Sequence, residues 1–293
     1  MATIPPLLRD LTPPIVLRAV RKLLPRGAAE APAAPAAPAL EPAAETAAET
    51  ATPPPIATRP DYGFFGDYRD FDEAAADASE YDSFKIAQSA AAQIPTFFQD
   101  AYCEIDGRYQ QVHSALASVM ERLGKNRLAV LDIGGGNGNN FIACSKLSPS
   151  APYDWTIVET ESMCAACDGR LPVTWTSTIP DGAFDVVLIS GTLQYLPDPY
   201  AALQDLGRRA PWLIVHRTPI LDSATDRLTI QIVDPNIYPG ELLRHWFLAG
   251  ENLRRSLGSV GEIVLSWRNL QDDPAYAHLG AKAYGYLVRS RLT

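Results

Sequence analysis

The chain has 293 residues, of which 47% are hydrophobic, and it carries a formal net charge of −9 at pH 7. This length allows one large domain with additions, and the acidity disfavours nucleic-acid binding, which needs basic side chains against phosphates. No run of about 18 apolar residues is present, so no membrane-spanning helix is expected. The four cysteines fit a reducing cytoplasm, and no group of His, Asp and Glu has metal-ligand spacing, so no metal is expected.

The N-terminal segment, residues 1–26, is predicted to contain a short basic amphipathic helix. Apolar residues recur at helical spacing over 14–24, beside three cations. These cations are Arg18, Arg21 and Lys22. Such a helix could lie on the anionic inner face of the plasma membrane, or it could dock on the domain itself. Residues 27–60 are almost only Ala, Pro, Glu and Thr, a composition that predicts a disordered linker.

Residues 61–124 are predicted to form a helical cap region that precedes the first strand of a sheet. The run 62–68 is aromatic and turn-rich, whereas 74–92 and 109–123 have apolar residues at helical spacing. A helical block in this position commonly covers the mouth of the sheet. We therefore expect its aromatic side chains either to pack or to contact a ligand.

A nucleotide-binding pattern opens the region 125–293. An apolar strand ends at Asp132, and a glycine turn follows that opens a helix over about 139–147. The glycines of the turn are Gly134, Gly135, Gly136 and Gly138. Their G-x-G-x-G spacing is that of class I S-adenosylmethionine (SAM) methyltransferases, whereas the dinucleotide fingerprint would need a glycine at Asn139. A tight turn that binds nothing is the alternative interpretation.

Further strands are predicted over 155–159, 184–190 and 211–216, with helices over about 161–168 and 199–208 between them. This alternation indicates right-handed βαβ units and therefore an α/β, Rossmann-like, mostly parallel sheet. Ligands of such sheets bind at the carboxyl ends of the strands. The side chains expected at those ends are Glu159, Ser190 and His216.

Three side chains complete the predicted cofactor site. Glu159 can accept hydrogen bonds from both ribose hydroxyls of a nucleoside, and Ser190 ends the third strand. Ser177 follows a strand near 172–176, where class I methyltransferases contact the adenine ring. We therefore predict cofactor contacts for Asp132 and the glycine turn together with these three residues.

The C-terminal part is predicted to complete the sheet. Residues 227–233 alternate like a half-buried strand, helices are expected near 240–257, and strands over 260–267 and 283–289. Methyltransferase sheets close with a hairpin that contains an antiparallel strand, and this tail fits that arrangement.

Seven sequence blocks in a fixed order resemble one protein family. They span 63–68, 81–83, 131–135, 193–199, 217–219, 226–231 and 237–239. Over about residues 61–290 the chain resembles class I SAM-dependent methyltransferases associated with bacterial surface-polysaccharide clusters. The resemblance implies SAM as cofactor and a glycan or glycolipid acceptor. The chain departs from the family at His216, where an acidic residue is usual, and at 240–245.

Methyl transfer to a hydroxyl requires the acceptor to lose a proton, so a positioned base would help. His216 is the candidate base, because histidine has an ordinary pKa of about 6.5; a strand-end histidine bonded to a neighbouring loop is the alternative. Gln194 and Tyr195 follow the third strand, in the segment that lines the methyl-transfer pocket of many such enzymes. Gln194 is expected to hydrogen-bond the acceptor or the cofactor, or else to orient the loop. The candidate acceptor contacts are Arg217, Asp222 and Tyr238.

The sequence thus predicts a cytoplasmic SAM-dependent O-methyltransferase that acts on a glycan or glycolipid. Two alternatives stay open: a non-catalytic SAM-binding or scaffold protein, and an NAD(P)-dependent oxidoreductase on a similar sheet. Methyl turnover with polysaccharide intermediates separates the enzyme from the scaffold, and the identity of the bound cofactor separates it from the oxidoreductase.

Overall fold

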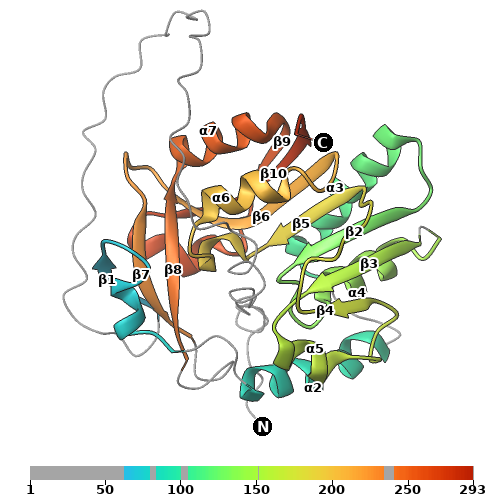
Figure 1. The fold of residues 1–293 in the computed structure, drawn as a ribbon, viewed down its shortest axis with the longest axis horizontal. Helices are drawn as coiled ribbons and strands as arrows, with labels where there is room; N and C mark the ends of the chain where they lie inside the picture. Colours follow the sequence, from blue (N-terminus) through green and yellow to red (C-terminus); the bar gives the residue numbers. More distant parts are fainter. Residues whose placement is uncertain (1–62, 80–83, 100–104, 151, 234–240, 293) are drawn as a thin grey trace, which may run out of the picture.

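The computed structural model describes residues 63–79, 84–99, 105–150, 152–233 and 241–292 (Figure 1). The predicted helix over 14–24, the linker over 27–60 and the candidate Tyr238 lie outside the described residues. Within the described part of the chain, no helix has both the length and the apolar character needed to cross a bilayer.

The centre of the molecule is a mostly parallel sheet in the order β4-β3-β2-β5-β6, extended at one edge by β10 and β9. Its strands are β2 (Leu128–Ile133), β3 (Tyr153–Val158), β4 (Thr174–Thr176), β5 (Val186–Ser190), β6 (Trp212–Leu221), β9 (Gly261–Arg268) and β10 (Lys282–Ser290). β10 runs antiparallel to both β6 and β9, which confirms the antiparallel closing strand. The chain reverses its direction of travel across the sheet between β2 and β5, and this switch point is where such sheets bind ligands. The predicted α/β, Rossmann-like architecture is confirmed.

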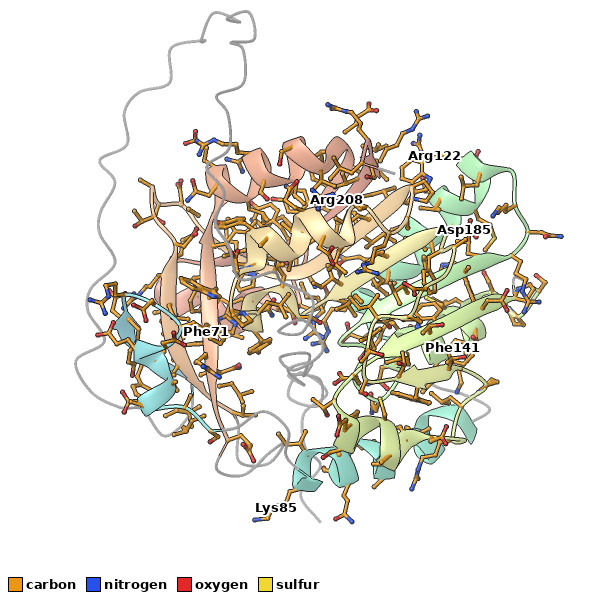
Figure 2. The ribbon with its side chains drawn as sticks, viewed as in Figure 1. Phe71, Lys85, Arg122, Phe141, Asp185 and Arg208 are labelled. Atoms are coloured by element: carbon orange, nitrogen blue, oxygen red, sulfur yellow. The ribbon has the colours of Figure 1, made fainter. Side chains whose placement is uncertain are left out.

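Helices cover both faces of this sheet (Figure 1). One face carries α2 (Phe84–Gln99), α3 (Gly107–Leu123), α4 (Asn139–Leu147) and α5 (Glu161–Cys167); the other carries α6 (Pro199–Leu206) and α7 (Gly250–Val260). In β2, Val130 packs in the first core and Leu131 in the second, which is why the strand is a continuous apolar run. On the first face the ring of Phe141 lies 5.8 Å from that of Trp155 (Figure 2).

A second, antiparallel sheet adjoins the first. Its strands are β1 (Gly63–Tyr68), β7 (Arg227–Ile232) and β8 (Leu242–Ala249), and the end of β8 pairs with the end of β6. Phe71, which Figure 2 labels, follows β1. The guanidinium carbon of Arg244 lies 4.1 Å from the centre of its ring, a cation–π contact that shields a buried charge. Short helices η2 (Glu73–Ala76), η3 (Leu193–Tyr195), α8 (Asp273–Tyr276) and η4 (Ala277–Leu279) fill the connections.

Two sequence expectations fail in this second sheet. The helices expected near 240–257 are wrong over their first half, which is strand β8, because helix α7 begins only at Gly250. The segment 62–68, which was expected to be turn-rich, contains strand β1. Most of β8 is buried regardless of which face its side chains occupy, so its sequence lacks the alternation that identifies a strand.

Candidate functional site

The glycine turn after β2 presents bare backbone on its outer side. Gly134, Gly136 and Gly138 have φ of 68°, 59° and 83°, a region that favours glycine. A Cβ at Gly136 would meet nothing within 4 Å, whereas one at Gly135 would come within 2.7 Å of Asp132 Oδ2. Gly138 is the N-cap of α4 and brings no side-chain cap. The turn therefore rests on Asp132 and leaves its other side open to a ligand.

Asp132 supports this turn from below. Its buried carboxyl accepts hydrogen bonds from Trp155 Nε1 at 3.1 Å and from Asn140 Nδ2 at 3.5 Å. Burial raises the pKa of this carboxyl to about 7, although the two hydrogen bonds act in the opposite direction. A direct contact between Asp132 and a cofactor stays a prediction.

Glu159 joins the end of β3 to the glycine turn. Its Oε1 accepts a hydrogen bond from the backbone N–H of Gly136 at 2.9 Å, and its Oε2 accepts one from Thr160 N at 3.0 Å. Its own N–H donates to the carbonyl of Thr176, the residue before Ser177, at 3.0 Å. The two predicted nucleoside contacts, Glu159 and Ser177, thus lie at neighbouring strand ends on one side of the turn.

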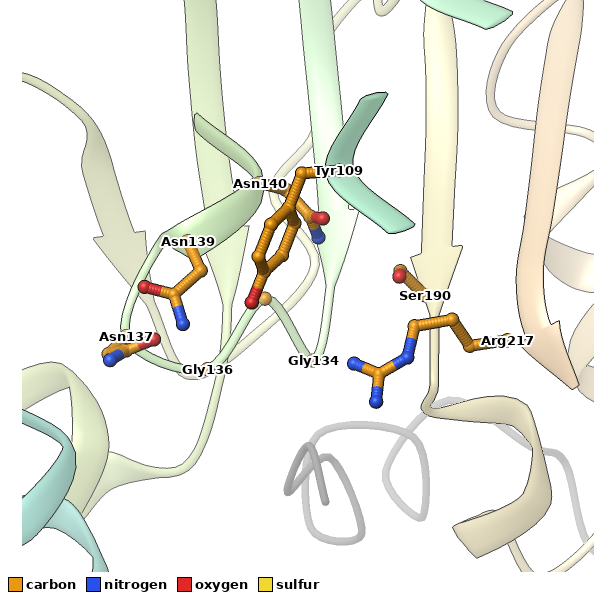
Figure 3. A pocket seen from close by; sticks show the side chains of 9 residues that line it. Tyr109, Gly134, Gly136, Asn137, Asn139, Asn140, Ser190 and Arg217 are labelled. Atoms are coloured by element: carbon orange, nitrogen blue, oxygen red, sulfur yellow. The ribbon is translucent and has the colours of Figure 1, made fainter. Parts of the chain in front are cut away.

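A small cavity lies above the turn at the switch point (Figure 3). It is lined by Tyr109, Gly134, Gly135, Gly136, Asn137, Asn139, Asn140, Ser190 and Arg217. The free space in it is about 30 Å³, whereas sites for small ligands usually offer about 300–1,000 Å³. The free space of the cavity is therefore smaller than a nucleoside requires. The sequence identified the glycines, Ser190 and Arg217, but it missed Tyr109 and the three asparagines.

His216, the candidate base, is buried beside Ser190. Its Nδ1 lies 2.9 Å from Ser190 Oγ, and its Nε2 lies 3.2 Å from Gln111 Oε1 and 3.4 Å from Asn269 Nδ2. Its side chain is only 1% exposed, and burial, assisted by the charge of Arg217, lowers its pKa to about 3. His216 lies inside β6, which continues to Leu221, and not at the strand end that the sequence predicted. Its ring is bonded to neighbouring elements, as the alternative interpretation expects, and its role as a base stays a prediction.

Arg217 is held in an unusual conformation by a buried carboxylate. Among the described residues it is the one non-glycine residue with positive φ, at 57°. Its Nε and Nη2 donate to Asp272 Oδ2 at 2.8 Å and Oδ1 at 3.2 Å. Arg108 Nη1 and Asn269 Nδ2 also donate to Asp272, at 3.1 and 2.9 Å. Burial alone would raise the pKa of Asp272, but Arg217 and Arg108 together hold it below its usual range.

Gln194, Tyr195 and Asp222, the remaining candidates within the described residues, do not line the cavity. In η3, Tyr195 Oη donates to Gln231 Oε1 at 2.6 Å, and Gln194 is buried with no hydrogen-bond partner for its Oε1 in the described part of the chain. Asp222 is exposed beyond the end of β6. Over the same described ranges, no group of three or more His, Cys, Asp or Glu side chains is arranged to hold a metal ion.

Comparison with known proteins shows that the chain is similar to several solved structures. No protein-family model matches the chain, and no curated protein matches it. The N-terminal domain of EvdMO1, crystallised with S-adenosylhomocysteine (SAH) and D-fucose, is 15% identical over 70% of this chain and 95% of its own, with a TM-score of 0.46. A SAM-dependent methyltransferase from Clostridium acetobutylicum is 13% identical over 68% of this chain and 97% of its own, with a TM-score of 0.42. A SAH-bound protein from Burkholderia thailandensis is 11% identical over 62% and 76%, with a TM-score of 0.44. At these identities and TM-scores the likeness assigns no function to this chain.

Proposed function

We propose that the chain is a SAM-dependent methyltransferase. One observation carries the proposal: at the switch point, Glu159 of β3 meets the backbone of Gly136 in a turn of positive-φ glycines. In sheets of this topology an acidic residue after the second strand binds ribose hydroxyls, and the glycines admit the ligand against the backbone. The G-x-G-x-G spacing favours SAM over a dinucleotide.

The residues present fit such a cofactor. The open side of Gly136 would face the ligand, Glu159 would accept the ribose hydroxyls, and Ser177 would contact adenine. When bound, SAM supplies a methyl group activated by its sulfonium. The protein holds the two reactants in line, and such positioning is a large part of the catalysis of displacement reactions.

We propose a hydroxyl of a glycan or glycolipid as the methyl acceptor. The resemblance to polysaccharide-cluster methyltransferases over about residues 61–290 supports this assignment. The polar side chains that line the cavity, three asparagines and Ser190 among them, suit an acceptor rich in hydroxyl groups. Gln194, Tyr195, Asp222 and Tyr238 are the proposed further contacts.

Calorimetric titration of the full chain with SAM, SAH and NADH tests the cofactor assignment. We expect SAM and SAH to bind and NADH not to bind, because the turn lacks the third dinucleotide glycine. Transfer of a labelled methyl group to lipid-linked oligosaccharides then tests the reaction. Failure of both SAM and SAH to bind would refute the proposal, and binding of NADH would favour the oxidoreductase. Tight SAM binding with no turnover across the acceptor panel would favour the scaffold.

We further propose that the helix over 14–24 attaches the enzyme weakly to the cytoplasmic face of the membrane, where lipid-linked glycans are assembled. Each Lys or Arg near an anionic leaflet contributes about 1 kcal/mol, so a few cations give reversible, salt-sensitive binding. Full-length protein should sediment with anionic liposomes at low salt, and deletion of residues 1–26 should release it while SAH affinity stays unchanged. Full-length protein that stays in the supernatant would favour docking of the helix on the protein itself.

A further inference from the structure

The cavity above the glycine turn has two sides that differ in their side chains: three asparagines lie on one side, and Ser190 and Arg217 lie on the other (Figure 3). Glu159 bonds to the turn at Gly136, which fixes the end proposed for the nucleoside. Ser190 and Arg217 line the same cavity beside Gly134, and Figure 3 shows Arg217 extending toward this glycine. A ligand whose ribose lies at Glu159 would therefore place its non-nucleoside portion beside Arg217.

The backbone conformation of Arg217 directs its side chain toward the part of the cavity beside Gly134. The pairing of β10 with β6 shifts register between Tyr284 and Tyr286, opposite the segment that contains Arg217. Such irregularities redirect side chains and often occur beside functional sites. A positive φ at a non-glycine residue is strained, and it persists because the bidentate ion pair with Asp272 holds the side chain in place.

The chemistry of the guanidinium suits one class of ligand group. Of the described residues that line the cavity, Arg217 alone carries a charge. Asp272 engages its Nε and Nη2, and the planar guanidinium is the side-chain group whose geometry matches a carboxylate. Arg108 shares Asp272 and pairs with Asp106 at 2.9 Å, which keeps the supporting cluster charge-balanced before the ligand arrives.

We propose that Arg217 is the carboxylate-binding residue of the cavity, and this inference rests on the proposed SAM-binding function. The carboxylate can belong to the amino-acid portion of the cofactor or to an acidic sugar of the acceptor. Asp272 is the positioning residue that sets the direction of Arg217. Both sources present the same planar group, which the fork of an arginine binds in a bidentate manner.

The test compares two ligands that share a nucleoside and differ in the amino-acid portion. SAH carries the carboxylate, and 5′-methylthioadenosine lacks it. In calorimetric titrations, Arg217→Gln should weaken SAH binding by about ten- to a hundred-fold, the range of a charged hydrogen bond, and change methylthioadenosine binding less than about two-fold. Arg217→Asn provides a second variant, because asparagine tolerates positive φ, and it should give the same selective loss. Arg127→Gln, at an exposed ion pair with Asp154, should alter neither affinity.

A second arm identifies an acceptor carboxylate. The SAH-loaded protein is titrated with glucuronate and with glucose; loss of glucuronate binding alone in Arg217→Gln, with SAH affinity unchanged, would assign Arg217 to the acceptor. Equal losses for SAH and methylthioadenosine, or no loss for SAH and glucuronate, would overturn the inference. Wild-type protein that binds neither nucleoside would overturn the proposed function, and this inference with it.

Discussion

Replacement of Gly136 by valine is expected to abolish binding of SAM and SAH while the protein still folds. A side chain at this position meets no other atom of the protein within 4 Å, so it would occupy the space above the turn where the ligand is to lie. The φ of 59° also strains any non-glycine residue, at a cost of roughly 1–2 kcal/mol. Calorimetry gives the affinity and urea unfolding gives the stability, so the two effects are measured separately.

Gly124→Val is the matched control for this substitution. Gly124 is the C-cap of α3, its φ is 61°, and a Cβ there also meets nothing within 4 Å. The helix rise of about 1.5 Å per residue places Gly124 roughly 22 Å along α3 from Tyr109 at the cavity. Both variants should lose similar stability, but only Gly136→Val should lose SAH binding. If Gly136→Val kept wild-type SAH affinity, the ligand would have to lie elsewhere than on the turn.

The parallel part of the fold could be predicted closely because its signals are local. A helix was expected over about 139–147, and α4 spans Asn139–Leu147. Strands were expected over 260–267 and 283–289, and each end of β9 (Gly261–Arg268) and β10 (Lys282–Ser290) differs from the expected one by a single residue. Apolar runs bounded by glycine, proline and capping residues define such elements, and their alternation with helices indicates a parallel sheet.

Of the second sheet, β7 was expected as a strand over 227–233 and spans Arg227–Ile232, but its two partner strands could not be predicted in the same way. Strand β8 was expected to be helical, because a short apolar run buried on both faces gives no periodicity that separates a strand from a helix. Its pairing with β7 fixes its structure, and β1, far earlier in the chain, completes the sheet. Long-range pairing of this kind leaves no local trace in the sequence.

In the candidate site, too, features with a local sequence signal could be predicted, and features set by distant residues could not. The positive φ of Gly134, Gly136 and Gly138 follows from the glycine pattern itself. The partner that directs Arg217 is Asp272, 55 residues later, and it has no local signal. His216 was expected at the end of a strand over 211–216, but β6 continues to Leu221, and Gln111 of α3 contacts the His216 ring from a distant part of the chain.

Acidification below about pH 6.5 is expected to destabilise the fold, with His245 as a principal cause. This side chain is fully buried, and its ring lies 4.7 Å from those of Phe64 and Phe247 and 5.1 Å from that of Tyr195. Within the described ranges, neither ring nitrogen has a hydrogen-bond partner. Burial lowers its pKa to about 3, whereas the unfolded chain protonates histidine at about 6.5. The folded state therefore keeps its full stability above about pH 6.5 and loses up to about 1.4 kcal/mol per pH unit as the pH falls toward 3.

His245→Phe should remove this sensitivity, because phenylalanine fits an aromatic surrounding and does not titrate. At pH 7 the variant should be as stable as the wild type or more so, since an unpaired buried polar group costs about 1–3 kcal/mol. Between pH 6.5 and 5 it should lose about 2 kcal/mol less than the wild type in urea unfolding, and the remaining slope should include His216, whose pKa is lowered in the same direction. Equal slopes for wild type and His245→Phe would show that His245 is not protonated during acid unfolding and that other groups carry the pH dependence.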